Sequence, residues 1–179
     1  GGHLEQPLGA LGYFQAMLEI YEQTAKAADL PDYIVIASGS GGTQAGLIAG
    51  VKALGLKTRV IGICVSDKKE EFFPIVKQVT MELLTTLGLD LQIDDDDIIL
   101  FDDYLGAGYG QITAETAGVI RNLFKKEALV LDPVYTAKAM IGLLDLVERH
   151  YFSSKDRLLF VHTGGTPALF ALQDYIMSC

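Results

Sequence analysis

The sequence predicts an α/β fold, and two observations support this prediction. Short apolar runs rich in β-branched residues alternate with segments in which apolar residues recur every three or four positions. The connections between these segments are short, which is typical of strands joined by helices into a parallel sheet. We therefore expect a three-layer, Rossmann-like architecture: an open, mostly parallel sheet with helices on both faces. Ligands of such sheets bind at the carboxyl ends of the strands.

Each predicted element follows from its hydrophobic period and from the turn residues at its ends. The third helix is expected to begin near Phe73, because Pro74 is best accommodated in a first helical turn. In chain order we expect a helix over residues 8–28, a strand over 33–37, a helix over 43–54, a strand over 58–65, a helix from Phe73 to Leu87, a strand over 98–101, a helix around 112–123, an extended piece over 129–131, a helix over 134–150, a strand over 157–162 and a final helix.

Composition and charge restrict the classes of function. The 179 residues, half of them hydrophobic, are enough for one core, so we expect a single domain over residues 1–179. A net charge of −9 disfavours nucleic acid and anionic membranes as partners, and no apolar run approaches the roughly 18 residues of a membrane span. Two cysteines make no disulfide framework, which favours the cytoplasm. A chain that begins Gly1, Gly2, His3 is expected to be a fragment or a processed piece.

Four consecutive aspartates, residues 94–97, precede one short predicted strand. A cation site is conceivable there, but four adjacent carboxylates rarely all face inward. A solvated turn with helix-capping roles is the favoured interpretation. The histidines have no metal-like spacing among themselves or with Cys64, so we expect no metal site.

The glycine-rich stretch at residues 37–46, Ala-Ser-Gly-Ser-Gly-Gly-Thr-Gln-Ala-Gly, follows a predicted strand and leads into a predicted helix. Glycines allow backbone N–H groups to converge, and the helix start adds a partial positive charge, so a phosphate is well matched. No lysine follows the last glycine, and the dinucleotide pattern G-x-G-x-x-G is met only loosely, which favours a single terminal phosphate. A glycine-rich turn without a ligand is equally compatible with this stretch alone.

Five motifs in order resemble those of one enzyme group. They are Gly1 and Gly2 with residues 7–13, the glycine-rich stretch, Gly-Tyr-Gly at 108–110, Leu-Asp-Pro-Val-Tyr-Thr-Ala-Lys-Ala-Met at 131–140 and His-Thr-Gly-Gly-Thr-Pro-Ala-Leu at 162–169. Over essentially the whole chain they resemble the tryptophan-synthase-β-like, fold type II group of pyridoxal-phosphate enzymes. The Thr-Gln-Ala-Gly sequence points to the branch that contains 1-aminocyclopropane-1-carboxylate deaminase and D-cysteine desulfhydrase. Ala137 departs from the glycine that the family more often carries.

The resemblance implies roles for individual residues. Tyr109 and Tyr135 would be catalytic phenols over the cofactor face, able to move protons if their pKa values are shifted toward neutrality. Thr166 would meet the pyridine nitrogen through its hydroxyl, and Thr136 takes a position where the deaminases carry a glutamate. Tyr13 is expected to be a packing residue. The implied phosphate binders are Gly39, Ser40, Gly41, Gly42 and Thr43.

Pyridoxal chemistry also needs a lysine in Schiff base with the cofactor, and the resemblance assigns that lysine to a segment before Gly1. Lys138 lies in a matched block but is not that residue, so a helix-surface or ion-pair role is expected for it. The chain would then be the large-domain portion of an enzyme, without the small domain and the Schiff-base lysine segment. Alone it is expected to be inactive.

The leading hypothesis is a pyridoxal-phosphate-dependent lyase or deaminase that acts on a small amino acid by β-elimination, as a homodimer. Thr136 brings no carboxylate to the pyridine nitrogen, and a weaker electron sink suffices when thiolate is the leaving group. D-cysteine desulfhydrase-like activity is therefore preferred to 1-aminocyclopropane-1-carboxylate deamination. Two other classes stay open: a non-catalytic module that binds phosphate or pyridoxal phosphate, and an interaction protein that pairs through an exposed apolar face.

Overall fold

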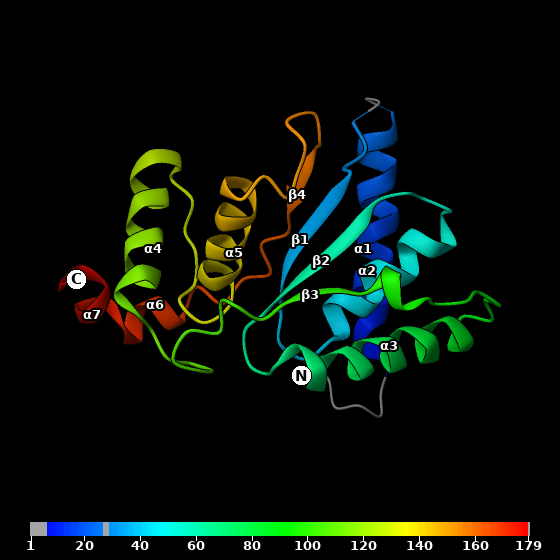
Figure 1. The fold of residues 1–179 in the computed structure, drawn as a ribbon, viewed down its shortest axis with the longest axis horizontal. Helices are drawn as coiled ribbons and strands as arrows, with labels where there is room; N and C mark the ends of the chain where they lie inside the picture. The colour runs from blue at the N-terminus through cyan, green and yellow to red at the C-terminus, as the bar shows by residue number, and fades with distance from the viewer. Residues whose placement is uncertain (1–6, 27–28, 179) are drawn as a thin grey trace.

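A computed structural model describes residues 7–26 and 29–178, and within them the chain has the predicted α/β architecture. One four-stranded sheet has the order β3-β2-β1-β4, and each neighbouring pair is parallel. Helices cover both of its faces (Figure 1). The strands are β1 (Tyr33–Ser38), β2 (Arg59–Cys64), β3 (Ile99–Phe101) and β4 (Leu158–Phe160).

The helices divide into two groups, one on each face of the sheet (Figure 1). The group formed by α1, α2 and α3 covers one face, and α4 and α5 cover the other, with the short α6 and α7 beside α4. The helices are α1 (Leu8–Ala25), α2 (Gly42–Ala53), α3 (Lys69–Thr86), α4 (Ala114–Glu127), α5 (Thr136–Glu148), α6 (Ala168–Ala171) and α7 (Gln173–Ser178).

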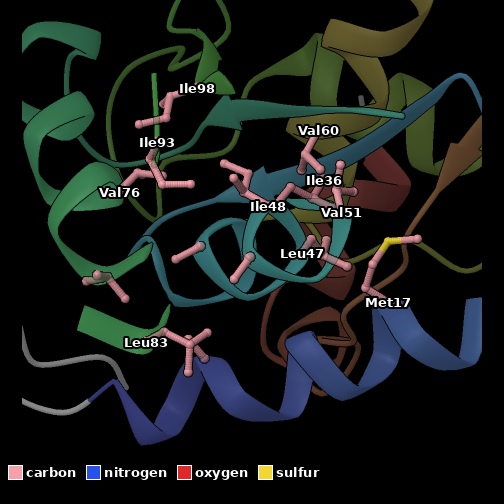
Figure 2. Close-up of a cluster of buried hydrophobic side chains, with 14 of the residues drawn as sticks. Met17, Ile36, Leu47, Ile48, Val51, Val60, Val76, Leu83, Ile93 and Ile98 are labelled. Atoms are coloured by element: carbon pink, nitrogen blue, oxygen red, sulfur yellow. The ribbon is translucent and has the colours of Figure 1, made fainter. Parts of the chain in front are cut away.

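The sheet separates two hydrophobic cores. Because successive strand residues point to opposite faces, Ile34 and Ile36 of β1 join the core beneath α1, α2 and α3, whereas Val35 and Ala37 join the core beneath α4 and α5. Figure 2 shows the first core, in which Met17 of α1 joins side chains of α2, α3 and the sheet. With both faces covered, the strands read as almost continuous apolar runs, which is why they could be predicted.

The strand order creates a switch point between β1 and β4. The chain moves outward from β1 to β2 and β3, then returns through α4 and α5 to add β4 on the other side of β1. Open α/β sheets bind ligands in the crevice at the carboxyl ends of the two strands that flank such a point. Here β1 ends at Ser38, and β4 leads into the pair Gly164 and Gly165. The fold therefore brings the glycine-rich stretch and the last polar loop together.

Helix α1 approaches α2 closely at two glycines. A Cβ atom at Gly46 would lie 2.2 Å from the carbonyl oxygen of Ala10, and one at Gly50 would lie 2.6 Å from Cβ of Met17. Neither glycine has a positive φ, so close approach and not backbone conformation explains them. This contact anchors the helix that follows the glycine-rich turn.

The predicted start of the third helix is wrong by about one turn. Helix α3 begins at Lys69 and not near Phe73, and it contains Pro74. Glu70 and Glu71 in the first turn favour the positive end of the helix dipole. Pro74 removes a single hydrogen bond close to the helix start, where the loss can be tolerated.

The four aspartates form a solvated turn, as predicted. Residues Asp95–Asp97 make a single 3-10 turn, and its side chains are paired with lysines of the neighbouring helices. The Nζ atom of Lys77 lies 2.6 Å from Oδ1 of Asp95, and that of Lys52 lies 2.7 Å from Oδ2 of Asp97. Within residues 7–26 and 29–178, no three His, Cys, Asp or Glu side chains are grouped so that they could hold a metal ion.

Other boundaries differ at the chain ends. The predicted strand 157–162 shortens to Leu158–Phe160, and the predicted final helix is the two short helices α6 and α7, separated at Leu172. The last two residues of the predicted helix 8–28, and the first motif at Gly1 and Gly2, lie outside the described residues. No described helix is long and apolar enough to cross a membrane.

The α1–α2 contact leads to a stability prediction with opposite signs at two helical glycines. Gly46→Ala places a methyl group on the carbonyl oxygen of Ala10, and we expect it to destabilise the chain by about 1–3 kcal/mol. Gly118→Ala in α4 meets no atom within 4 Å and should stabilise by about 0.5–1 kcal/mol through helix propensity. Urea unfolding of both variants measures the two effects. Equal stabilisation by both substitutions would contradict the close contact.

Candidate active site

A cavity of about 710 Å³ lies at the carboxyl ends of β1 and β2. It is lined mainly by the glycine-rich turn (residues 39–43), the residues after β2, the tyrosine loop (residues 105–110) and the closing loop (residues 162–167), with further residues from α1 and the start of α5. The glycine-rich turn, the tyrosine loop and the closing loop, which are far apart in the sequence, thus contribute to one site. The lining residues include Tyr13, Ser38, Gly39, Ser40, Gly41, Gly42, Thr43, Ser66, Asp67, Tyr109, Tyr135, Thr163, Gly164 and Gly165.

The glycine-rich turn has the conformation of an anion cradle. Gly41 has a φ of +81° and is the N-cap residue of α2, and no side chain caps this helix. The N–H groups of its first turn therefore have no side-chain acceptor at the cap position, and Gly42 and Thr43 of this turn line the cavity. A Cβ atom at Gly39 would lie 3.2 Å from Val65 and 3.4 Å from the ring of Tyr135. Glycine at this position lets the backbone run directly beneath the tyrosine.

A buried polar network fixes the turn to the sheet. The hydroxyl of Ser38 donates to Oε1 of Gln44 at 2.8 Å, and Nε2 of Gln44 donates to the carbonyl of Ile99 at 2.9 Å. Gly62 leaves room for this side chain, because a Cβ atom there would lie 2.2 Å from Oε1 of Gln44. The start of α2 is thereby tied to β1, β2 and β3.

Asp132 organises the start of α5. Its fully buried carboxylate accepts N–H donors from Val134 (2.8 Å), Tyr135 (2.9 Å) and Thr136 (2.7 Å), and the Thr136 hydroxyl at 2.7 Å. A Cβ atom at Gly165 would lie 2.6 Å from Cγ of Asp132. One carboxylate therefore fixes the backbone that carries Tyr135, and the closing loop packs against the same side chain.

The two predicted catalytic tyrosines meet at the cavity. Their hydroxyls are hydrogen-bonded to each other, and their rings lie edge to face with centroids 5.9 Å apart. The hydrogen bond to Tyr109, followed by burial and the nearby Tyr109 and Asp132 charges, raises the pKa of Tyr135 to about 12. This shift is opposite to the one that proton abstraction at neutral pH would need. Tyr135 therefore keeps its proton at neutral pH, and its hydroxyl can donate a hydrogen bond.

The interpretation of Lys138 as a surface or ion-pair lysine is wrong. The residue is 1 % exposed, and its Nζ atom donates to the carbonyls of Leu105 (2.8 Å) and Gly108 (2.7 Å). No ion pair of the described part of the chain includes it. Desolvation lowers the pKa of Lys138 below its ordinary value. The carbonyls of a glycine loop replace the expected carboxylate, and no sequence pattern signals such partners.

The two predicted threonines occupy different environments. Thr136 is fully buried, its hydroxyl is engaged by Asp132, and it is not among the residues that line the cavity. Thr166 is half-buried and directly follows Gly164 and Gly165, which line the cavity. Direct contact of either threonine with a cofactor ring stays a prediction.

Sequence reasoning missed two polar residues of the site. Ser66 and Asp67 follow β2 after Val65 and line the cavity, and the Ser66 hydroxyl donates to the carbonyl oxygen of Gly39 at 3.1 Å. Their position after a predicted strand was the available signal. Tyr13 also lines the cavity, although a packing role was expected for it.

The tyrosine pair leads to a titration prediction. Tyr109→Phe removes the hydroxyl that stabilises protonated Tyr135, so the pKa of Tyr135 should fall from about 12 toward the ordinary value of about 10. NMR titration of tyrosines labelled at the ring carbon next to the hydroxyl measures it. Tyr151→Phe is the control, because that ring packs among other aromatic rings. An unchanged Tyr135 titration in Tyr109→Phe would show that the hydroxyls are not paired in solution.

Comparisons with known proteins agree with this geometry. A family model described as pyridoxal-phosphate dependent enzyme matches residues 2–164. D-cysteine desulfhydrase of Yersinia enterocolitica is 47% identical over 163 residues, which are 91% of this chain and 48% of that protein. D-cysteine desulfhydrase of Serratia proteamaculans is 43% identical over 164 residues, 92% of this chain and 49% of that protein. The chain spans about half the length of the curated relatives it matches.

Solved structures give the same result. An ACC deaminase homologue superposes with a TM-score of 0.86 at 37% identity, over 97% of this chain and 50% of that one. A fungal L-serine ammonia-lyase from Rhizomucor miehei, at 15% identity and a TM-score of 0.61, shows the fold alone; it covers 94% of this chain and 56% of that one. The family model covers most of the chain, and relatives above 40% identity match more than nine tenths of it. The chain therefore belongs to the pyridoxal-phosphate dependent enzymes of fold type II.

Proposed function

We propose that this chain is the large-domain portion of a pyridoxal-phosphate-dependent lyase that acts on a small amino acid, with D-cysteine desulfhydrase-like β-elimination as its reaction. The observation that supports this most directly is the convergence of an anion cradle and a paired tyrosine on one cavity. The similarity to D-cysteine desulfhydrases over more than nine tenths of the chain supports the same choice.

The phosphate of the cofactor binds to the glycine-rich turn in this proposal. The binding residues are Gly39, Ser40, Gly41, Gly42 and Thr43, all of which line the cavity. Two features support the fit: the left-handed Gly41 and the helix start without a side-chain cap. Bound pyridoxal phosphate would supply an electron sink for charge that develops at the α carbon of the substrate.

Tyr135 acts as a hydrogen-bond donor in this proposal. A phenol with a pKa of about 12 keeps its proton at neutral pH, so its hydroxyl can donate a hydrogen bond to the substrate and to a departing group. Tyr109, whose hydroxyl contacts that of Tyr135, holds and exchanges the proton with it. A departing thiolate can accept this hydrogen bond, and because an ordinary thiol has a pKa of about 8.5 it can leave without taking the proton.

The pyridine nitrogen meets only hydroxyl groups in this proposal. Thr166 of the closing loop is the proposed partner of the pyridine nitrogen. Thr136 matters because it stands where the deaminases carry a glutamate, so no carboxylate is available at that position. The Thr136 hydroxyl is already engaged by Asp132, which is consistent with an indirect role. A neutral pyridine stabilises a carbanion less, and this favours elimination of a good leaving group such as thiolate over opening of a cyclopropane ring.

A second candidate function is 1-aminocyclopropane-1-carboxylate deamination. The TM-score of 0.86 against the ACC deaminase homologue favours it. A module that only binds the cofactor would keep the cradle and lose the chemistry. The substrate test below separates these three.

The covalent lysine lies outside this chain in our proposal. Lys138 is occupied by two carbonyls, and no lysine is among the described residues that line the cavity. The chain alone is then inactive, and the complete enzyme works as a cytoplasmic homodimer.

Anion binding gives the first test. Gly41→Asp places a carboxylate where the phosphate sits, and we expect it to abolish pyridoxal-phosphate and inorganic phosphate binding in calorimetry. Gly88→Asp is a matched control, since Gly88 also has a positive φ (+70°) and lies at the end of α3, away from the cavity. It should lose stability without losing binding. Equal pyridoxal-phosphate affinity of Gly41→Asp and the unmodified chain would show that the site is elsewhere.

Substrate choice gives the second test. The complete enzyme, supplied with D-cysteine, should release sulfide, ammonia and pyruvate, and 1-aminocyclopropane-1-carboxylate should give little 2-oxobutyrate. The two products are assayed separately with matched enzyme and cofactor concentrations. Efficient 2-oxobutyrate formation without sulfide would establish the second candidate and refute the argument from Thr136. Cofactor binding without either product would leave the binding module.

A further inference from the structure

Lys138 is a buried cation that the proposed chemistry does not use. It lies in the first turn of α5, is 1 % exposed, and has the carbonyls of Leu105 and Gly108 as its hydrogen-bond partners. Burying an ammonium group is costly unless its hydrogen bonds are made, and the positive end of the helix dipole adds to the cost. If packing were the only role of this residue, an apolar side chain of similar length would fill the space without the cost of burying a charge. The two hydrogen bonds to loop carbonyls therefore point to another role.

Both contacts are to the tyrosine loop, which has little intrinsic rigidity. Gly106, Gly108 and Gly110 all have positive φ, and glycines lose more conformational freedom on ordering than other residues. The backbone hydrogen bonds within this segment are long: the Gly108 nitrogen lies 3.3 Å from the carbonyl oxygen of Leu105, and the Gln111 nitrogen lies 3.2 Å from that of Gly108. The shorter, charge-assisted bonds from Lys138 at 2.8 and 2.7 Å are therefore the strong ties of the loop.

The position of Lys138 couples the two tyrosines. Tyr135 is the N-cap residue of α5, three residues before Lys138, and Tyr109 directly follows Gly108. The same helix start thus carries one tyrosine and the ammonium group that holds the loop of the other. The two tyrosine hydroxyls can form their hydrogen bond only while the tyrosine loop stays next to the start of α5.

We propose that Lys138 is a positioning residue, an internal cation that holds the tyrosine loop so that Tyr109 pairs with Tyr135. Without the ammonium group, the two loop carbonyls lose their donor and the loop samples conformations in which the hydroxyls separate. The structural part of this inference stands independently of the proposed function, and the effect on turnover rests on it.

A second cavity makes the proposal testable by rescue. About 280 Å³ of space adjoins Lys138 and is also lined by Asp103, Glu115 and Asp145. Its acidic lining favours the approach of a small cation. Lys138→Ala removes the atoms that propylammonium contains, so this amine can refill the space and donate to the same carbonyls. Lys138→Met fills the space with an uncharged chain of similar length and should resist rescue.

Hydrogen exchange measured by mass spectrometry on the full chain is the primary readout. Amides of residues 105–111 should exchange at least tenfold faster in Lys138→Ala and Lys138→Met, while those of β1 and β2 stay unchanged. Propylammonium should restore protection in Lys138→Ala only. Lys125→Met, at an exposed lysine in the last turn of α4, is the matched control. Unchanged exchange in the loop, or an equal increase throughout the chain, would overturn the proposal. If Lys138→Ala does not fold, Lys138→Met decides between these outcomes.

Two further readouts distinguish this inference from the proposed function. In both Lys138 variants the pKa of Tyr135 should fall from about 12, as it should in Tyr109→Phe, because the paired hydroxyl is lost. In the complete enzyme kcat should fall at least tenfold with KM nearly unchanged, and propylammonium should recover it in Lys138→Ala. A complete enzyme without lyase activity would refute the proposed function and leave the exchange and titration results to decide on Lys138. An unchanged Tyr135 titration, or unchanged turnover in an active enzyme, would overturn the positioning role.

Discussion

The buried carboxylate of Asp132 is the interaction on which the site depends. It accepts four hydrogen bonds from three consecutive residues, and bonds to a charged group contribute about 1.5–3 kcal/mol each. Its position determines where α5 begins and therefore where Tyr135 lies. Gly165 packs against it without room for a Cβ atom, so the closing loop is positioned by the same group. A single charge thus aligns two segments that lie about thirty residues apart in the sequence.

The two faces of the sheet contribute different parts of the site. Helix α2, from the layer of α1 and α3, presents its start and the glycine-rich turn, which suit an anion. Helix α5, on the other face, presents Tyr135 and, through Lys138, the tyrosine loop. The starts of α2 and α5 meet at the switch point, at the carboxyl end of the sheet. The residues proposed for phosphate binding and the two tyrosines are consequently held by different layers of the fold, on opposite faces of one parallel sheet.

Charge in this cavity is unevenly distributed. The glycine-rich turn offers backbone donors, while Asp67 brings a carboxylate to the end of β2, close to Ser66. Backbone donors at one place and a carboxylate at another can accommodate a ligand that carries both an anionic and a cationic group. A phosphate-bearing cofactor together with an amino-acid substrate would be such a ligand. The buried cation at Lys138 is separate from this surface, because its donors are used by loop carbonyls. The lysine therefore supports the geometry of the site and does not contribute its charge to the cavity.

Local patterns in the sequence were sufficient for the strands β1 and β2, the helix between them and the positive φ of a glycine before α2. Hydrophobic periodicity and the conformational freedom of glycine depend on a few neighbouring residues, so both can be recognised in the sequence without a structure. The motif order was likewise sufficient for the family. The family resemblance placed Tyr109 and Tyr135 over one cofactor face, and the position of Ser66 and Asp67 after a strand was a signal that sequence reasoning did not use. Tertiary structure alone decided that the two tyrosine hydroxyls pair and that Lys138 is buried against two carbonyls. These contacts join segments far apart in the chain, and main-chain carbonyls carry no side-chain signature, so no spacing in the sequence could predict them. The start of α3 was also decided this way, because Pro74 forbids only one hydrogen bond and the surrounding turn remains free to form.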